Sequence, residues 1–354
     1  MPVAALRCLP VRTICRLLVS LTVACSATTA FGQQTPPRPL KAVIISMFPP
    51  EAKPWIAPLK LEQEIPVPGL LPESNAIRCN ADDVCLMIAG MGHANVAASV
   101  MALTLDPRFN LKQTYFLVAG IAGIDPAQGT TGTATWARYL VDVGIAHEID
   151  AREMPKGWQR GYLGIMTKGP GEKPKFEYHT EVAQLDEALL QKALALSQDV
   201  TLADSDKAKR YRANYRKAPA NQPPTVKQCD TLGGDTWWHG HRLSQHARDW
   251  TKLLTDGRGT YCTTQQEDNA TYNALARAAA AGKVDIKRLA VLRTASNFDR
   301  PYPGQSAYAS LMASTNGGSG GFGPATENLF RVGSLLINDI VSHWPAWQNG
   351  VPQP

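Results

Sequence analysis

The chain has 354 residues, 44% of them hydrophobic, and a formal net charge of +6. This length and composition suit one large domain or two small ones, with enough apolar side chains for a sizeable core. Three positive charges, on Arg7, Arg12 and Arg16, lie at the N-terminus, and without them the net charge falls from +6 to +3. A strongly basic nucleic-acid-binding surface is therefore excluded.

The first 32 residues have the pattern of a cleaved signal peptide. The three arginines precede an apolar core at Leu17 to Ala24, and Ala30-Phe31-Gly32 is a small-x-small cleavage motif. Cleavage after Gly32 would remove 32 of the 354 residues and leave 322. We therefore predict a signal peptide over 1–32, a flexible leader over 33–40 and one domain over 41–354.

Export is expected to the periplasm or the extracellular space. Cys25 leaves a second interpretation open, a lipid anchor, although Thr22 stands where a large aliphatic residue is usual. No later stretch reaches the roughly 18 uninterrupted apolar residues of a membrane-spanning helix. The mature protein is therefore expected to be soluble.

Strand-like and helical runs alternate along the rest of the chain. Strands are predicted over Lys41 to Met47, Val84 to Gly90, Thr114 to Ile121, Thr133 to Val143 and Ile286 to Thr294. Helices are predicted over Ala94 to Leu105, Glu181 to Leu196, Ala270 to Ala281 and Glu327 to Val341. This alternation predicts a single α/β domain with a mixed, mostly parallel central sheet between two layers of helices.

Two polar stretches interrupt this pattern. Asp204 to Lys227 is basic, with interleaved tyrosines, but it carries no nucleic-acid-binding signature and is interpreted as a surface excursion. The glycine-rich stretch 316–323 is expected to be a flexible loop before the last helix, where it could serve as a lid.

Four cysteines remain after the signal peptide, an even number in a chain expected to be exported. Cys79 and Cys85 flank a turn-forming run, which predicts a disulfide across a hairpin, and Cys229 with Cys262 then follows by elimination. Zinc binding is the weaker alternative, because the spacing is not CxxC and no histidine lies beside these cysteines. We expect neither a metal nor a cofactor.

Glycine-rich turns follow two predicted strands. Gly90 and Gly92 precede His93 at the start of a helix, and Gly120 and Gly123 end the next long strand. Glycines at such positions let the backbone approach a ligand closely, although a tight structural turn would use the same residues.

A third strand end carries acidic residues. Tyr261 to Thr264 favours a strand, and Gln266-Glu267-Asp268 opens a helix. Acids in a first helical turn offset the helix dipole, but the carboxyl edge of an α/β sheet is also where ligands bind. Both interpretations stay open at this point.

Taken in order, these motifs resemble the nucleoside phosphorylase and nucleosidase superfamily, and most closely the purine nucleoside permease family. The resemblance extends from about Lys41 to the last helix. It rests on a first strand followed by Met47 and Glu51, on the two glycine turns, and on two later motifs, Gln266-Glu267 and Ser296-Asn297. It implies the three-layer phosphorylase/hydrolase-like fold.

The resemblance also implies roles for individual residues. Glu267, with Gln266 beside it, would bind the ribose hydroxyls, since a carboxylate accepts two hydrogen bonds and donates none. Ser296 and Asn297 would read the purine, and Asp268 would cap the helix. Trp237 is a further purine-binding candidate through stacking, although packing in the core is the commoner use of tryptophan.

Departures from the superfamily pattern bear on the reaction. Val118 to Ile121 carries no arginine and no hydroxyl group, which makes phosphorolysis doubtful unless Arg138, Thr130 or Thr131 holds the phosphate. Glu51 could activate water as a general base, as in nucleosidases, or be an ordinary loop acid.

The residues at the base end of the site also depart from the pattern. Asn297 cannot donate a proton to the leaving purine as an aspartic acid would. Asp299 is the candidate replacement acid, and a turn residue or salt-bridge partner is the alternative.

We therefore expect an exported purine-nucleoside-binding protein that serves nucleoside uptake, handing its ligand to a separate membrane transporter. The alternative is a purine nucleosidase that releases free base by hydrolysis, with phosphorolysis less favoured. Related folds are often oligomeric, so a homo-oligomer is a further expectation drawn from the resemblance.

Overall fold

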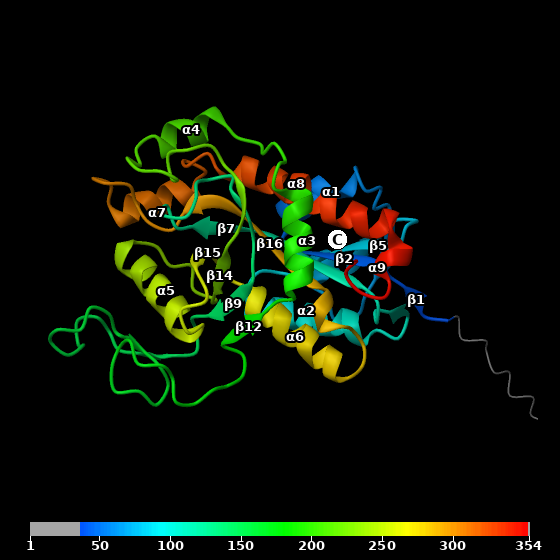
Figure 1. The fold of residues 1–354 in the computed structure, drawn as a ribbon, viewed down its shortest axis with the longest axis horizontal. Helices are drawn as coiled ribbons and strands as arrows, with labels where there is room; N and C mark the ends of the chain where they lie inside the picture. Colours follow the sequence, from blue (N-terminus) through cyan, green and yellow to red (C-terminus); the bar gives the residue numbers. More distant parts are fainter. Residues whose placement is uncertain (1–35, 353–354) are drawn as a thin grey trace, which may run out of the picture. The chain divides into compact units, whose positions relative to one another are not determined.

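A large mixed sheet forms the centre of the computed structural model, which describes residues 36–352 (Figure 1). Its central strands pair in parallel: β5 (Val84–Ile88), β2 (Ala42–Ser46), β7 (Tyr115–Ile124) and β16 (Leu289–Phe298). β7 pairs with three strands: β2 along its first half, β15 at its last residues, and β16 along nearly its whole length.

The sheet continues on both sides of this centre. One edge adds β4 (Ala76–Cys79) and β3 (Gln63–Pro66), both antiparallel to their neighbours. The other side contains β15 (Tyr261–Gln265), β14 (Asp230–Gly233), β9 (Tyr139–Asp142), β12 (Val182–Gln184), β8 (Ala134–Trp136) and β13 (Val226–Gln228). Two small pairs lie outside it: β1 (Arg38–Pro39) with β6 (Phe109–Asn110), and β10 (His147–Glu148) with β11 (Tyr162–Leu163).

Side chains of the central strands alternate between two cores, as the period of two in a strand requires. In β2, Val43 and Ile45 pack with the core under α2 and α6, whereas Ala42 and Ile44 pack with the core under α1 and α8. Strands buried on both faces explain why the sequence shows continuous apolar runs rather than alternating ones.

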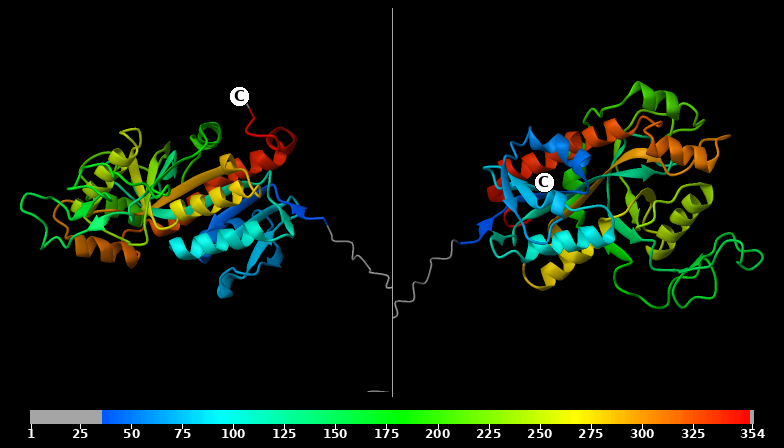
Figure 2. Two further views of the ribbon diagram at one scale, coloured as in Figure 1. Left: turned by 90° about the horizontal axis from the view of Figure 1, so that it is seen from below. Right: turned by 180° about the vertical axis from the view of Figure 1, so that it is seen from behind.

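Helices cover both faces of the sheet. α2 (His93–Leu105) and α6 (Asp268–Ala280) pack together on one face. α1 (Pro49–Ile56), α3 (Glu187–Ser197), α8 (Phe322–Ser342) and α9 (Trp344–Trp347) lie on the other (Figure 2). α4 (Asp206–Arg212), α5 (His241–Leu254) and α7 (Ala307–Thr315) lie around the half of the sheet that contains β14 and β15 (Figure 1). Short 3-10 turns occur at Pro72–Ser74 and Ile286–Arg288.

Two predicted elements are divided in the structure. The strand expected over 133–143 is split into β8 and β9, because the Asp230 carboxylate accepts the backbone N–H groups of Arg138 and Tyr139, at 3.1 and 2.9 Å, and turns the chain. The helix expected from Glu181 begins only at Glu187, since Val182–Gln184 pairs with β9 and the Asp186 side chain accepts the N–H of Leu189 at 2.9 Å.

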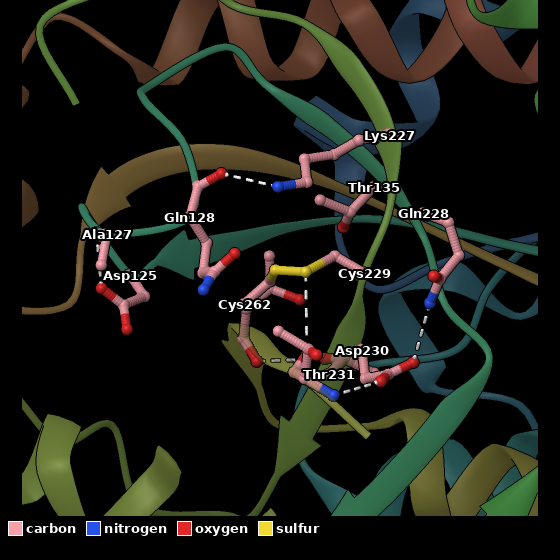
Figure 3. Close-up of a disulfide and its surroundings, with 12 residues drawn as sticks. Asp125, Ala127, Gln128, Thr135, Lys227, Gln228, Cys229, Asp230, Thr231 and Cys262 are labelled. Carbon is pink, nitrogen blue, oxygen red and sulfur yellow. Dashed lines mark hydrogen bonds between the residues drawn. A yellow bond between two sulfur atoms is a disulfide. The ribbon is translucent and has the colours of Figure 1, made fainter. Parts of the chain in front are cut away.

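Both cysteine pairs form disulfides. Cys79 and Cys85 are directly opposite each other on β4 and β5, which makes a staple across this hairpin. Cys229, just before β14, is joined to Cys262 in β15, and both are buried (Figure 3). Beside this bond Lys227 donates to the carbonyl of Gln128 at 3.0 Å, and burial lowers the pKa of Lys227.

The predicted signal peptide and residues 33–35 of the predicted leader lie outside the described residues. Arg38 and Pro39 pair with β6, and the Arg38 side chain lies 3.0 Å from the Asp83 carboxylate, so this end of the leader is fixed to the domain. From Pro37 onward the chain forms one compact unit. No helix within residues 36–352 combines the length and apolarity needed to cross a bilayer.

Candidate functional site

The ends of β2, β7, β15 and β16 surround a cavity of about 330 Å³. Seven of the candidate site residues line it, from five separate parts of the sequence: Glu51, Gly123, Trp237, Gln266, Glu267, Ser296 and Asn297. The carboxyl ends of the parallel strands β2, β7 and β16 lie at the same edge of the sheet, and β15, antiparallel to β7, pairs there with the last residues of β7. We name this the strand-end cavity.

Glu267 is held from two sides at the junction of β15 and α6. Its Oε1 accepts the backbone N–H of Gly92 at 3.2 Å, at the N-terminus of α2. Its Oε2 accepts from Arg293 Nη2 at 3.0 Å and from the N–H of Gln266 at 3.2 Å. The carboxylate therefore lies between the positive end of a helix dipole and a guanidinium.

Asp268 does not cap α6, contrary to the sequence interpretation. Gln265 does so, since its Oε1 accepts the N–H groups of Glu267 and Asp268 at 2.6 and 2.8 Å. Asp268 instead forms a buried ion pair with Arg293, whose Nη2 lies 2.6 Å from Oδ1. A buried carboxylate needs such a partner, and the helix terminus is already satisfied by the amide of Gln265.

Glu51 lies in the first turn of α1 and also lines the cavity. Its two carboxylate oxygens accept backbone N–H groups at 2.7 Å, one from Met47 at the end of β2 and one from Ile121 in β7. Burial raises the pKa of Glu51 to about 7, against the opposing effect of nearby Arg293. The carboxyl group can therefore exchange a proton near neutral pH.

Ser296 and Asn297 lie together at the end of β16. Ser296 Oγ donates to Asn297 Oδ1 at 3.0 Å, and Asn297 Nδ2 donates to the carbonyl of Phe298 at 2.9 Å, which fixes the orientation of the amide. Trp237 lines the same cavity with 51% of its surface exposed, so its ring is available for stacking.

The first glycine turn, at Gly90 and Gly92, supports the cavity from outside. Gly90 and Gly92 have φ of +89° and +86°, a region that favours glycine, and they turn the chain from β5 into α2. They do not line the cavity; Gly92 reaches it only through its bond to Glu267, and the N–H of His93 is taken by Asp235 Oδ1 at 2.7 Å.

Gly120 lies behind the cavity, between two of its charged groups. A Cβ at this position would overlap the guanidinium of Arg293 and lie 3.3 Å from Glu51 Oε1. At Gly123, which does line the cavity, a Cβ would lie 3.2 Å from Asn297 Nδ2. The absence of side chains at both glycines therefore gives room to neighbouring polar groups.

Asp299 does not line the cavity, so the structure does not bring this candidate acid to the purine end of the site. Its Oδ2 accepts from Ser244 Oγ at 2.7 Å and from Tyr261 Oη at 2.9 Å, in a buried cluster with Asp125 and Arg300. Burial and the charge of Asp125 raise the pKa of Asp299. The alternative interpretation, a salt-bridge partner, agrees with this position.

The three residues considered for phosphate also lie elsewhere. Arg138 forms a two-point ion pair with Glu187, with both bonds 2.7 Å long, and Thr130 Oγ1 donates to the carbonyl of Ala220 at 2.6 Å. None of Arg138, Thr130 and Thr131 lines the cavity. In the part of the chain that the structure describes, Arg293 is the one lysine or arginine that lines the cavity, and its charge is shared with Glu267 and Asp268.

The sequence analysis assigned no role to Arg293, although this residue lies three positions before the Ser296-Asn297 motif. The signal was a cation directly after the apolar run Leu289 to Leu292 of β16, because a buried charge requires a buried partner. The apolar mouth of the cavity was also missed: Phe48, Met91 and Phe322 surround it, and Phe48 and Phe322 lie 6.3 Å apart between ring centroids. Ser314 and Thr315 of α7 line the cavity beside the glycine-rich loop.

Solved structures with a similar fold include nucleosidases and a futalosine hydrolase. One is a mutant of the Helicobacter pylori MTAN with 5'-methylthioadenosine in its active site, with a TM-score of 0.50, 14% identity, and coverage of 84% of this chain and 99% of that one. Another is the futalosine hydrolase of Helicobacter pylori, with a TM-score of 0.50, 14% identity, and coverage of 85% and 98%. At this identity the similarity concerns the fold alone, and it confirms the predicted three-layer phosphorylase/hydrolase-like architecture.

Curated relatives of known sequence are much more similar to this chain in sequence than these solved structures are. A probable purine nucleoside permease of Schizosaccharomyces pombe is 36% identical over 347 residues, which covers 95% of this chain and 99% of the relative. A purine nucleoside permease of Candida albicans is 37% identical over 323 residues, covering 90% and 79%. The family model described as purine nucleoside permease matches residues 39–352. This chain therefore belongs to the purine nucleoside permease family.

Proposed function

We propose that the protein binds a purine nucleoside in the strand-end cavity and that this binding serves nucleoside uptake. The observation that carries the proposal is the placement of Glu267, Asn297 and Trp237 around one cavity of about 330 Å³. This volume lies within the usual range for small-molecule sites, roughly 300–1,000 Å³. Membership of the permease family supports the link to uptake.

Ribose would bind at Glu267. A carboxylate offers about four acceptor positions, and the N–H groups of Gly92, Gln266 and Arg293 use three of them. One position therefore remains for a ribose hydroxyl. A second hydroxyl would compete with the bonds from Gly92 or Gln266, which are the longer ones at 3.2 Å.

The purine would bind at the end of β16. Asn297 can offer both a donor and an acceptor to the edge of the base. Trp237, half exposed at the cavity wall, would stack on the ring. Phe48, Met91 and Phe322 provide apolar surface at the mouth.

Export and transfer to a membrane transporter complete the proposal. The protein contains two disulfides, and disulfides persist in oxidising compartments outside the cytosol. Their presence therefore supports export. The transporter would be a separate protein that receives the nucleoside from this one. Cells lacking the chain should then take up labelled inosine more slowly, and wild-type protein, but not Glu267→Gln, should restore the rate.

Titration calorimetry with inosine, adenosine and guanosine tests the binding directly. A hydrogen bond to a charged group contributes about 1.5–3 kcal/mol, so Glu267→Gln should weaken inosine binding by roughly 10- to 100-fold. The matched control is Glu187→Gln, which changes a half-exposed carboxylate outside the cavity. Wild-type protein should bind 2',3'-dideoxyinosine more weakly than inosine by a comparable factor. The Glu267→Gln variant should bind the two ligands with nearly equal affinity. Unchanged inosine binding in Glu267→Gln would overturn the proposal.

Hydrolysis is a second candidate function, favoured by the position and raised pKa of Glu51. Ionised Glu51 would take a proton from water as the water oxygen bonds to ribose C1'. The bond from C1' to purine N9 would break, and its electron pair would leave with the base. Within residues 36–352 the acids that line the cavity are Glu51 and Glu267, and Asp299 lies outside it, so no further acid is placed to assist that departure, which predicts slow turnover.

Phosphorolysis is less favoured, because the one arginine lining the cavity is already paired with two carboxylates. Chromatography of free base, with and without phosphate, separates the three outcomes. Base release that needs no phosphate, rises with pH around 7 and disappears in Glu51→Gln would establish hydrolysis. Binding without release in either buffer would establish nucleoside capture alone.

A further inference from the structure

A second cavity, of about 170 Å³, lies next to the strand-end cavity. It is bounded by residues after β9, by the segment after β14 and by α5. Thr236 lines both cavities, Trp237 lines only the strand-end cavity, and Trp238 lines only the second one. Two adjacent tryptophans therefore serve two different cavities.

The floor of the second cavity is apolar and aromatic. Leu232 and Ala247 are buried there, and Trp238 forms part of the wall. The rings of Tyr162 and His246 stack with centroids 4.8 Å apart and an interplanar angle of 15°. Aromatic faces and an apolar floor suit a small ring or a short alkyl group.

His246 is 3% exposed, and neither ring nitrogen has a hydrogen-bond partner within the described part of the chain. A buried polar group without a partner is costly, so it indicates a place where a ligand can contribute a hydrogen bond. Burial, together with the nearby charge of Arg160, lowers the pKa of His246 to about 4. The imidazole is therefore neutral at pH 7 and adds no positive charge to the cavity.

Two carboxylates provide the charge of the second cavity. Glu148 accepts the hydroxyl of Tyr162 at 2.9 Å, and Asp235 Oδ1 accepts the N–H of His93 at 2.7 Å. Among the described residues that line it there is no lysine or arginine. Both carboxylates are exposed to solvent at the rim, whereas the aromatic rings lie deeper.

We infer that this second cavity binds a small organic cation, with an apolar body on the floor and an ammonium group between Trp238 and the carboxylates of Asp235 and Glu148. Ammonium groups are attracted both to aromatic faces, tryptophan most strongly, and to carboxylates. An apolar cavity of about 150 Å³ holds one benzene ring, so a cavity of this size limits the body to about one ring. The ligand is thus smaller than a nucleoside and chemically distinct from it.

Benzylamine and benzyl alcohol form a matched pair of probes, because they have the same ring and nearly the same shape but differ in charge. Calorimetry on the full mature protein at pH 7 should show benzylamine binding at least about tenfold more tightly than benzyl alcohol, from the combined cation–π and ion-pair contacts. Saturating inosine should leave benzylamine binding unchanged, because the probes occupy the second cavity.

Trp237→Ala and Trp238→Ala provide the matched variants. Trp238→Ala should weaken benzylamine binding about tenfold or more and leave inosine binding unchanged, whereas Trp237→Ala should do the reverse. Glu148→Gln, at an exposed position, should reduce the preference for benzylamine over benzyl alcohol by a few-fold without affecting folding. This second readout remains available if Trp238→Ala does not fold.

Three results would overturn the inference: equal affinity for the two probes, displacement of benzylamine by inosine, or loss of benzylamine binding in Trp237→Ala but not in Trp238→Ala. The last two would place the probe in the strand-end cavity. Failure of inosine to bind, with benzylamine binding still dependent on Trp238, would overturn the proposed nucleoside function and leave this inference intact.

Discussion

Arg293 and Glu267 form an ion pair at the wall of the strand-end cavity, with Arg293 Nη2 3.0 Å from Glu267 Oε2. The same nitrogen lies 2.6 Å from Asp268 Oδ1, and all three side chains are buried. Because the guanidinium bridges two consecutive carboxylates, it fixes the direction in which Glu267 faces the cavity. Arg293 is thus a positioning residue for the group proposed to hold ribose.

Replacement of Arg293 should be strongly destabilising. Removing one member of a buried ion pair leaves the other charge uncompensated, and Arg293→Met should lower the free energy of unfolding by about 3–5 kcal/mol in urea titrations. The double variant Arg293→Met/Asp268→Asn should lose less than the single variant, since one uncompensated charge is also removed. Arg331→Met, at an exposed pair with Glu327, should cost at most about 1 kcal/mol. Equal losses in the two single variants would contradict this assignment.

Gly120 and Gly123 should differ in their tolerance of alanine. At Gly120 the added methyl group would overlap the Arg293 guanidinium, so Gly120→Ala should displace Arg293 and weaken inosine binding by about tenfold or more. At Gly123 the nearest atoms are 3.2 Å away, and a small shift of Asn297 or Thr264 accommodates the methyl group. Calorimetry on both variants checks the order, and a larger effect at Gly123 would reverse this assignment.

Glu51 should make stability depend on pH between about 4.5 and 7. Because burial raises the folded-state pKa of Glu51 from 4.5 to about 7, the folded protein binds this proton more tightly than the unfolded chain does. Wild-type protein should therefore lose stability relative to Glu51→Gln as pH rises through this window. At 1.36 kcal/mol per pKa unit the full change is roughly 3 kcal/mol.

Denaturant titrations of wild type and Glu51→Gln at pH 4.5, 6 and 7.5 measure this change. Glu327→Gln is the control, because that carboxylate is exposed. Its stability difference from wild type should vary by less than about 1 kcal/mol across the same range. A constant difference between wild type and Glu51→Gln would contradict the raised pKa.

The two disulfides should contribute unequally to stability. Cys229 and Cys262 are 33 residues apart, whereas Cys79 and Cys85 are separated by 6. Loop-closure entropy assigns about 3–4 kcal/mol to the longer loop and about 2 kcal/mol to the shorter one. Urea titration of the two double Cys→Ser variants should show this order, and the opposite order would mean that native contacts rather than chain entropy dominate.

Asp299→Asn should leave inosine affinity and any base release within about twofold of wild type, because Asp299 lies outside the cavity. The change should instead lower thermal stability, since Asp299 accepts bonds from Ser244 and Tyr261 in a buried cluster. A loss of base release of more than tenfold in the folded variant would restore Asp299 as the acid.

Much of the architecture was predictable from local patterns. The apolar runs at Lys41 to Met47, Val84 to Gly90 and Thr114 to Ile121 are the strands β2, β5 and β7, to within a few residues. A strand that is buried on both faces requires a continuous run of apolar residues, and such a run is easily recognised in the sequence. α5 was missed, although Ala247, Trp250 and Leu254 have the spacing of a buried helical face.

Candidate site residues could be found where a strand end, a glycine turn and a polar side chain occur together, as at Gln266-Glu267 and Ser296-Asn297. These sequence patterns did not predict which partner each polar side chain would face. The sequence suggested that Asp268 caps a helix and that Asp299 is a candidate acid, yet Asp268 pairs with Arg293 and Asp299 with Ser244 and Tyr261.

Periodicity and spacing along the chain were enough to predict the class of fold, the cysteine pairs and the order of the strand-end motifs, because these depend on short-range patterns. Tertiary structure alone decided which carboxylates face the cavity, that Gln265 rather than Asp268 caps α6, and that Trp237 and Trp238 serve different cavities. A buried polar group takes its partner from whichever segment the fold brings within hydrogen-bond distance. Gln265 is 2 and 3 residues from the N–H groups that it accepts, whereas Arg293 is 25 residues from Asp268 and Glu267 is 175 residues from Gly92.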